Sequence, residues 1–201
     1  NTNGQAVNVG IFSSSGTNAR TLTLGATVMT LINASNAWST SVVTNFTLNA
    51  NTSEIIFSGE SSDLITSATA SLTFNKITFS GVTTANGSNL ITGILSVGTL
   101  TYNPTANKFN LFRITNNITV TGTLTLAGNS AINRLLVSSA TLGTQVTITN
   151  AGATMTWSNV DFRDIALGTA YDAAAISGGS GNALGNSGIT FTTAQTNYWI
   201  G

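Results

Sequence analysis

The sequence predicts an all-β protein, specifically a right-handed parallel β-helix, a fold also called a β-solenoid. Three observations lead to this prediction. Short segments in which apolar residues alternate with Thr, Ser or Asn recur along nearly the whole chain, and such alternation is typical of strands with one buried face. Segments of similar composition return about every 20 to 25 residues, as expected for a repeat architecture. Gly and Asn stand between the segments, and long amphipathic helical patterns are absent.

The expected strands follow from this alternation, taken in chain order. In the first half they are 7–11, 21–25, 27–32, 45–49, 54–59, 71–81 and 91–97. In the second half they are 99–102, 108–115, 118–126, 135–137, 145–150, 154–157, 160–165 and 189–192. Asn33 and Asn36 end one strand, because Asn tolerates the left-handed conformation of turns. Gly122 predicts a bend or bulge inside its strand.

A β-sandwich or jelly roll is the alternative, because it also uses short alternating strands. The solenoid is favoured because Asn, Ser and Thr crowd the turns, where identical side chains of successive coils form ladders about 4.8 Å apart. We expect roughly eight or nine coils. Residues 1–165 are expected to form these coils, and residues 166–201 a loop-rich C-terminal capping or connecting segment with one helical turn or cap at 170–176.

Composition limits the function. Charged residues make up 6% of the 201 residues and the net charge is zero, against about 25% charged residues in an ordinary globular domain. The six basic residues are scattered, so no stripe is available for a nucleic-acid backbone or an anionic membrane. A charge-poor surface offers little repulsion between copies. We therefore expect self-association or a place in a larger assembly.

Missing residue types exclude several chemistries. The chain has no His and no Cys, which removes Ser-His-Asp and Cys-His catalysis and the usual zinc ligands. No glycine-rich phosphate loop occurs, and no cofactor is expected. No run of about 18 apolar residues exists, so no membrane-spanning helix is expected. Both ends look cut, and we expect the sequence to be a segment of a longer protein.

One stretch resembles a known group of proteins. Residues 119–130 read Thr-Val-Thr-Gly-Thr-Leu-Thr-Leu-Ala-Gly-Asn-Ser, and residues 158–164 read Ser-Asn-Val-Asp-Phe-Arg-Asp. With the intervening residues, this is similar to repeat units of large parallel β-helix surface proteins, found in phage tail or fibre-like proteins and bacterial adhesins. The end of the chain, 197–201, looks like the opening of a following module. The resemblance implies a right-handed parallel β-helix and no catalytic set.

Six carboxylates are the candidates for catalytic or metal-binding groups. Asp161 and Asp164 are the only near pair, but three residues apart on a strand they point to opposite faces. Arg163 shares the face of Asp161 and is expected to pair with it. Glu60 and Asp63 flank a Ser-rich turn, and calcium binding there is the less favoured alternative to plain solvation. We therefore predict no catalytic residues and no metal ligands.

Aromatic residues give the candidate contact residues. Trp157 and five phenylalanines are in phase with the apolar side of their strands and are expected inside: Phe46, Phe57, Phe74, Phe79 and Phe162. Trp38 is expected in a turn between Asn36 and Ser39, which makes it a candidate for surface contact. Tyr198 and Trp199, at the end of the chain, are expected to cap the stack or meet a neighbouring subunit.

The expected function is that of a non-catalytic structural or adhesive β-solenoid segment. Its setting would be extracellular: a virion fibre, spike or decoration protein, or a cell-surface adhesin, with surface glycan as a possible partner. One alternative is a carbohydrate-active β-helix enzyme, a polysaccharide lyase or glycosidase. Another is an ice- or glycan-binding module, suggested by Thr-x-Thr pairs, although their spacing along the sequence is irregular. These pairs lie at 21/23, 99/101, 121/123, 123/125 and 147/149.

Overall fold

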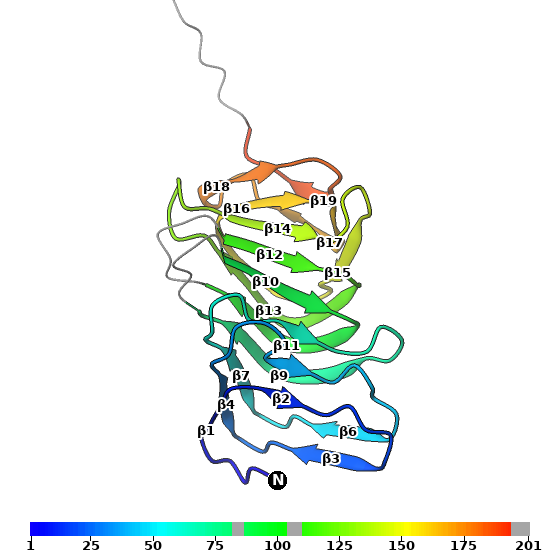
Figure 1. Ribbon diagram of the computed structural model, residues 1–201. Coiled ribbons are helices and arrows are strands. Elements are labelled where there is room, and N and C mark those ends of the chain that lie inside the picture. Colours follow the sequence, from blue (N-terminus) through cyan, green and yellow to red (C-terminus); the bar gives the residue numbers. More distant parts are fainter. Residues whose placement is uncertain (82–86, 104–109, 194–201) are drawn as a thin grey trace, which may run out of the picture.

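The protein is a stack of parallel β-coils (Figure 1). The computed structural model describes residues 1–81, 87–103 and 110–193. It forms a β-solenoid of about seven turns, and within these ranges it contains strands and no helix. Every strand pairing is parallel. The prediction of an all-β solenoid is therefore confirmed over the sandwich, while its right-handed sense stays a prediction.

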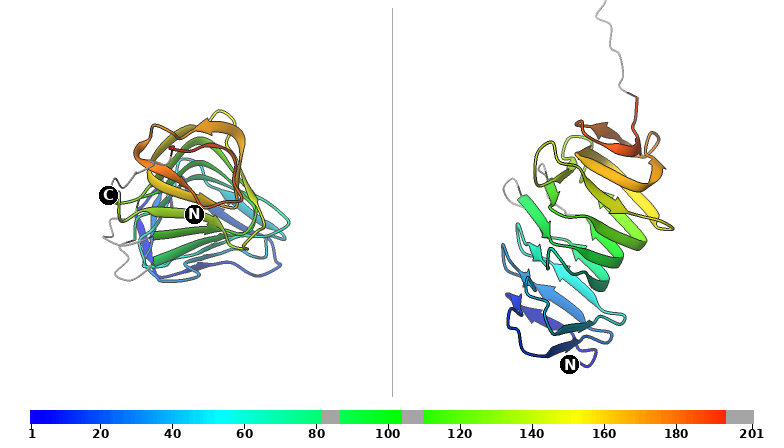
Figure 2. Two further views of the ribbon diagram at one scale, coloured as in Figure 1. Left: turned by 90° about the horizontal axis from the view of Figure 1, so that it is seen from above. Right: turned by 90° about the vertical axis from the view of Figure 1, so that its right-hand side faces the viewer.

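Each coil contributes strands to three faces, and the coils superpose when seen along the stack (Figure 2). Face one contains β1 (Val7–Val9), β4 (Val28–Leu31), β7 (Glu54–Phe57), the ends of β9 (Leu72–Phe79), β11 (Leu95–Tyr102) and β13 (Ile118–Ala127), and the start of β16 (Thr154–Arg163). Face two contains β2 (Phe12–Ser13), β5 (Trp38–Ser39), β8 (Leu64–Ile65), β10 (Gly87–Thr92), β12 (Asn110–Ile114), β14 (Leu135–Ser139), the end of β16, and β18 (Ser177–Asn182). Face three contains β3 (Arg20–Thr23), β6 (Phe46–Asn49), the starts of β9, β11 and β13, β15 (Val146–Thr149), β17 (Ile165–Asp172) and β19 (Ser187–Thr190).

The strand register sets the length of each coil. On face one Ile55 pairs with Ile77, 22 residues further on, and Ile77 pairs with Leu100, 23 residues further on. The next coils are longer. Leu124 pairs with Met155, 31 residues further on, because this coil contains the loop 128–134 and the turn 140–145. Long coils use up chain, which helps to explain why there are about seven turns instead of the expected eight or nine.

The core is a set of columns of apolar side chains that point inward from successive coils. Alternation along each strand places Leu31, Phe57 and Phe79 in one such column, continued by Tyr102, Leu126 and Trp157. The rings of Phe57 and Phe79 stack with centroids 4.6 Å apart. Of the residues expected inside, five are buried: Phe57, Phe74, Phe79, Trp157 and Phe162. The exception is Phe46, which is half-buried, with the Arg20 guanidinium 5.4 Å from its ring centroid.

A bulge marks the corner where β13 turns from face three to face one. Val97 pairs with Val120 and Thr99 pairs with Thr123, so Thr121 and Gly122 together lie opposite Gly98. A Cβ atom on Gly122 would lie 2.6 Å from the carbonyl oxygen of Gly98. Glycine at this position thus permits two backbones to approach closely, as the predicted bulge at Gly122 requires.

The parallel pairing continues beyond residue 165. β17 pairs with β15, β18 pairs with β16, and β19 pairs with β17. The residues expected to form a helical turn, 170–176, contain the end of β17 and a turn. In the described ranges, no segment forms a helix of the length and apolarity that a bilayer crossing needs.

Candidate functional site

Trp38, expected on the surface, lies in the core, so that prediction is wrong. It belongs to β5 and its side chain is fully buried. Its ring centroid is 4.3 Å from that of Phe12 and 5.4 Å from that of Phe74. Its indole Nε1 donates to the Thr40 hydroxyl over 3.0 Å, which satisfies the one polar atom that burial would otherwise penalise.

The other two candidates, Tyr198 and Trp199, lie outside the described residues. Within them, the exposed large apolar side chains include three on turns between strands. Ile132 is 88% exposed, Leu142 69% and Leu184 76%. These turn residues replace Trp38 as surface-contact candidates. Nothing in their sequence context distinguishes them from buried residues except that each lies among Gly, Asn, Ser and Thr.

Asp161 pairs with Arg134, and the expected partner Arg163 does not bind it. The Arg134 Nε lies 3.0 and 2.9 Å from the two Asp161 carboxylate oxygens, and Nη2 lies 2.7 Å from Oδ1. The two residues are 27 positions apart in the chain. Arg134 lies immediately before β14, and β14 pairs with β16, which contains Asp161. The coil register therefore brings together two residues that alternation along a single strand cannot connect.

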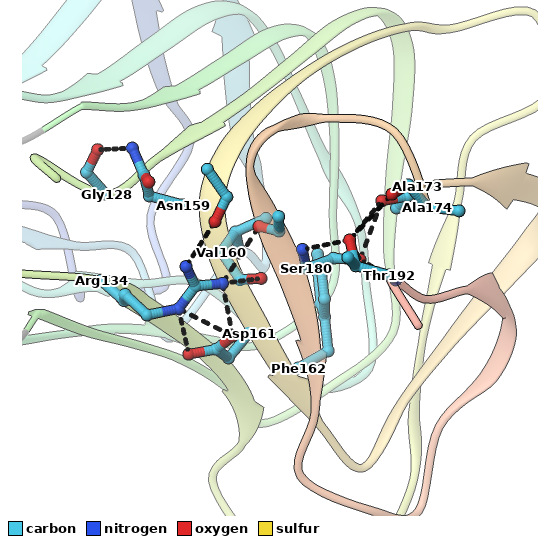
Figure 3. A network of polar contacts seen from close by, with 12 residues as sticks. Gly128, Arg134, Asn159, Val160, Asp161, Phe162, Ala173, Ala174, Ser180 and Thr192 are labelled. Carbon is cyan, nitrogen blue, oxygen red and sulfur yellow. Dashed lines mark hydrogen bonds and ion pairs between the residues drawn. The ribbon is translucent and has the colours of Figure 1, made fainter. Parts of the chain in front are cut away.

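The Arg134 guanidinium, which Figure 3 shows beside Asp161 and Val160, also binds the last coil. Its Nη1 donates to the Gly178 carbonyl over 2.6 Å, and its Nη2 donates to the Gly179 carbonyl over 3.0 Å. Beside it, the Ser180 and Thr192 hydroxyls donate to the carbonyls of Ala173 and Ala174 over 2.8 and 2.9 Å. With its hydrogen bonds directed at protein oxygens, this cluster resembles a structural clamp more than a substrate site.

Asp164 is also engaged within the protein. Its side chain is mostly buried and accepts a 2.9 Å hydrogen bond from the Gly143 N–H. Arg163 Nε lies 3.9 Å from its Oδ2, so Arg163 faces Asp164 and not Asp161. Paired carboxylate chemistry needs an acid and a base that both face an open groove. Asp161 and Asp164 instead have separate protein partners.

The turn considered for calcium has a different arrangement. Asp63 Oδ1 accepts a 3.0 Å hydrogen bond from the Leu90 N–H. Burial raises the pKa of the Asp63 carboxyl above its usual value, although this hydrogen bond and the Arg113 charge oppose the rise. Among the described residues, no group of three or more acidic side chains is placed to hold a metal ion.

A buried polar chain crosses the interior. The Tyr102 hydroxyl donates to Asn89 Oδ1 over 2.8 Å, and Asn89 Nδ2 donates to the Ser62 carbonyl over 2.8 Å. Tyr102 is fully buried, and burial raises the pKa of its phenol well above the ordinary value of 10.0. The chain satisfies polar atoms inside the core and has no open side, so it acts as a structural link between coils.

Face one has an ordered array of hydroxyls on its outer side. Thr99 pairs with Thr123, which pairs with Thr154, and Thr101 pairs with Thr125, which pairs with Thr156. The pairs named from the sequence do not include 154/156. The irregular spacing of the named pairs along the chain does not indicate an array. Coil loops of different length account for that irregularity, because they lie outside the paired strands. Repetition of Thr-Leu-Thr and Thr-Met-Thr was the available signal.

Comparisons of this chain with known proteins identify no relative. No protein-family model, curated protein or solved structure is significantly similar to this chain.

Proposed function

We propose that this chain is a non-catalytic structural and adhesive β-solenoid segment. Its setting would be a virion fibre, spike or decoration protein, or a cell-surface adhesin, and its location extracellular. The observation that carries the proposal is the unbroken column of core side chains, which runs in register from Leu31 to Trp157. In such a stack each coil contacts only the coils before and after it, so the protein extends in one direction. An extended stack of this kind serves as a spacer.

The state of the carboxylates supports the absence of catalysis. Glu54 binds Lys76 and Thr78 at 3.2 and 2.6 Å, and Asp161 is held by Arg134. Asp63 and Asp164 accept hydrogen bonds from backbone N–H groups. These four carboxylates thus have partners within the protein, whereas glycoside cleavage needs two carboxyl groups that both face the substrate.

The surface supports contact with other molecules. The exposed turn residues Ile132, Leu142 and Leu184 offer apolar area on an otherwise hydroxyl-rich surface. Among the described residues, β1 and β2 at one end and β18 and β19 at the other each pair with a single strand. Such strand edges are templates for further pairing, so end-to-end association is part of the proposal.

Polysaccharide binding and cleavage, measured in the same samples, test the proposal. The protein is mixed with a panel of bacterial capsular and O-antigen polysaccharides and with whole cells. Adsorption is then measured beside newly formed reducing ends. We expect adsorption to at least one surface, weakened in an Ile132→Ser/Leu142→Ser variant, and no new reducing ends.

Two results would contradict this proposal. New reducing ends that disappear in Asp161→Asn, while circular dichroism shows that this variant keeps its strands, would show a carbohydrate-active enzyme. Adsorption to none of the surfaces would remove the adhesive role.

A further inference from the structure

The threonine array of face one is two-dimensional. It has three rungs, one each from β11, β13 and β16, and every rung presents two threonines. The register runs without a shift through Thr99–Tyr102 and Thr123–Ala127. Neighbouring strands are about 4.8 Å apart, and residues two positions apart on a strand are separated by about 6.7 Å. The hydroxyls therefore form a grid of these two spacings.

The six hydroxyls of this grid are available to an external partner. In the described part of the chain, none of them makes a hydrogen bond with another residue. Threonines elsewhere differ: Thr78 is bound to Glu54 over 2.6 Å, and Thr115 donates to the Ile91 carbonyl over 3.1 Å. The grid threonines project outward, while Leu100, Leu124 and Met155 between them point toward the core.

The grid is also free of charge. The nearest charged residues of face one lie in the strands just before the grid. Lys76 of β9 is the register partner of Thr99 and borders the grid, and it pairs with Glu54 of β7 at 3.2 Å. Aromatic side chains of this face, such as Tyr102 and Trp157, are buried. A sugar site usually offers flat aromatic rings with carboxylates or amides. The grid offers methyl and hydroxyl groups alone, at fixed spacings.

We propose that this face binds ice. Oxygen atoms on the faces of hexagonal ice repeat at distances similar to those of the grid. The hydroxyls replace lattice water molecules, and the methyl groups between them order the water at the interface. The six grid side chains are neutral, so none of them must give up the hydration of a charge on contact with a neutral lattice. Lys76, at the edge of the grid, is paired with Glu54. This inference goes beyond the proposed function and does not depend on it.

The same strand provides a matched control. Thr119 also lies in β13 but on face three, where its column continues with Ser96 and Thr149. Two positions further along these strands lie Gly98 and the bulge at Gly122. Face three therefore has no second threonine column in register beside that of Thr119. Thr125→Lys places a long charged chain in the grid, whereas Thr119→Lys places the same chain outside it.

Thermal hysteresis and inhibition of ice recrystallisation measure the activity. We expect the wild-type protein to adsorb to ice and to inhibit recrystallisation. In Thr125→Lys the activity should fall at least tenfold, and Thr119→Lys should keep it. Circular dichroism checks that both variants keep their strands, and Thr101→Val provides a variant that preserves side-chain shape.

Three results would overturn the inference. If growing ice excludes the wild-type protein, the grid does not bind ice. Equal loss in Thr125→Lys and Thr119→Lys would place the activity elsewhere. Adsorption to crystalline cellulose or chitin through Thr125, without any effect on ice, would assign the grid to a polysaccharide.

Discussion

At the scale of single residues, burial of polar and aromatic groups between coils decides which positions tolerate change. Trp38 and Tyr102 are both fully enclosed, and each has one polar atom with a partner in the protein, Thr40 and Asn89 respectively. Their loss removes packing or leaves a partner without a hydrogen bond. Both side chains therefore act inside the stack of coils and not at its surface.

Replacement of Trp38 by Ala should strongly destabilise the protein. The indole lies between Phe12 and Phe74, and deletion of a buried Trp typically costs about 3–5 kcal/mol through lost contacts and a cavity. Ile132→Ala, at an 88% exposed position, should change the free energy of unfolding by less than about 0.5 kcal/mol. Urea denaturation of both variants measures this, and similar values for the two would place Trp38 at the surface.

Tyr102 predicts a dependence of stability on alkaline pH. Its folded-state pKa is raised above the unfolded value of 10.0. Its contribution to stability is therefore complete below pH 10 and is lost as the pH rises above 10, because the unfolded phenol releases its proton first. The decline is at most about 1.4 kcal/mol per pH unit. Tyr102→Phe should lack it, and should cost about 1–3 kcal/mol at neutral pH because Asn89 Oδ1 loses its donor.

Denaturation curves of wild type and Tyr102→Phe between pH 8 and pH 11 measure the difference. Parallel profiles for the two proteins would mean that the phenol titrates alike in the folded and unfolded states.

At the scale of elements, two devices hold successive coils together. One is the close backbone approach at the corner between faces three and one, where Asn75, Gly98 and Gly122 lie over one another. The other is the Arg134 clamp, which joins the residue before β14 to β16 and β18. Both depend on residues in different coils.

Gly122→Ala should weaken the corner. The new Cβ atom would lie 2.6 Å from the Gly98 carbonyl oxygen, and relieving this contact requires a backbone shift of the kind that costs about 1–3 kcal/mol. Gly10→Ala is the control, because nothing lies within 4 Å of its added Cβ. It should be neutral or stabilise the protein by up to about 1 kcal/mol. Thermal unfolding ranks the two, and the opposite order would contradict the described corner.

Arg134→Met should loosen the C-terminal coil selectively. It removes the hydrogen bonds to Gly178 and Gly179 and leaves Asp161 without its cation. Both side chains are about one quarter exposed, so we expect a cost of about 1–3 kcal/mol. Hydrogen exchange should accelerate in β18 and remain unchanged in β4 and β7. Lys76→Met, which removes a more exposed ion pair, should have little effect. Unchanged exchange in β18 would show that the clamp does not hold this strand.

At the scale of the whole molecule, strand alternation was enough to predict a stack of parallel coils, and the core phenylalanines followed from it. Phe57, Phe79 and Phe162 point inward because they share the phase of their apolar neighbours. Trp38 was misplaced because β5 has two residues, too few to show alternation, and Asn36 precedes it closely. The expected pairing of Asp161 with Arg163 came from a single strand, whereas the true partner is one coil away.

The threonine grid was not predictable for a related reason. Thr99 and Thr123 are 24 residues apart, and Thr123 and Thr154 are 31 apart. A sequence shows this as irregular spacing. The array becomes regular only when the extra residues are assigned to loops, and that assignment depends on the register of the core columns.

Everything proposed for this chain depends on coils stacked in register, and cysteine cross-linking tests this most directly. The chain has no native Cys, so an engineered pair reports on itself alone. Thr101 and Thr125 are register partners, at a separation of about 4.8 Å that a disulfide can span. Thr99 and Thr125 are offset by two residues, which places them about 8 Å apart, beyond that limit.

Under mild oxidation, mass spectrometry should show a disulfide in Thr101→Cys/Thr125→Cys and free thiols in Thr99→Cys/Thr125→Cys. A disulfide in Thr99→Cys/Thr125→Cys and none in Thr101→Cys/Thr125→Cys would contradict the register, and with it the stack of coils and the threonine grid.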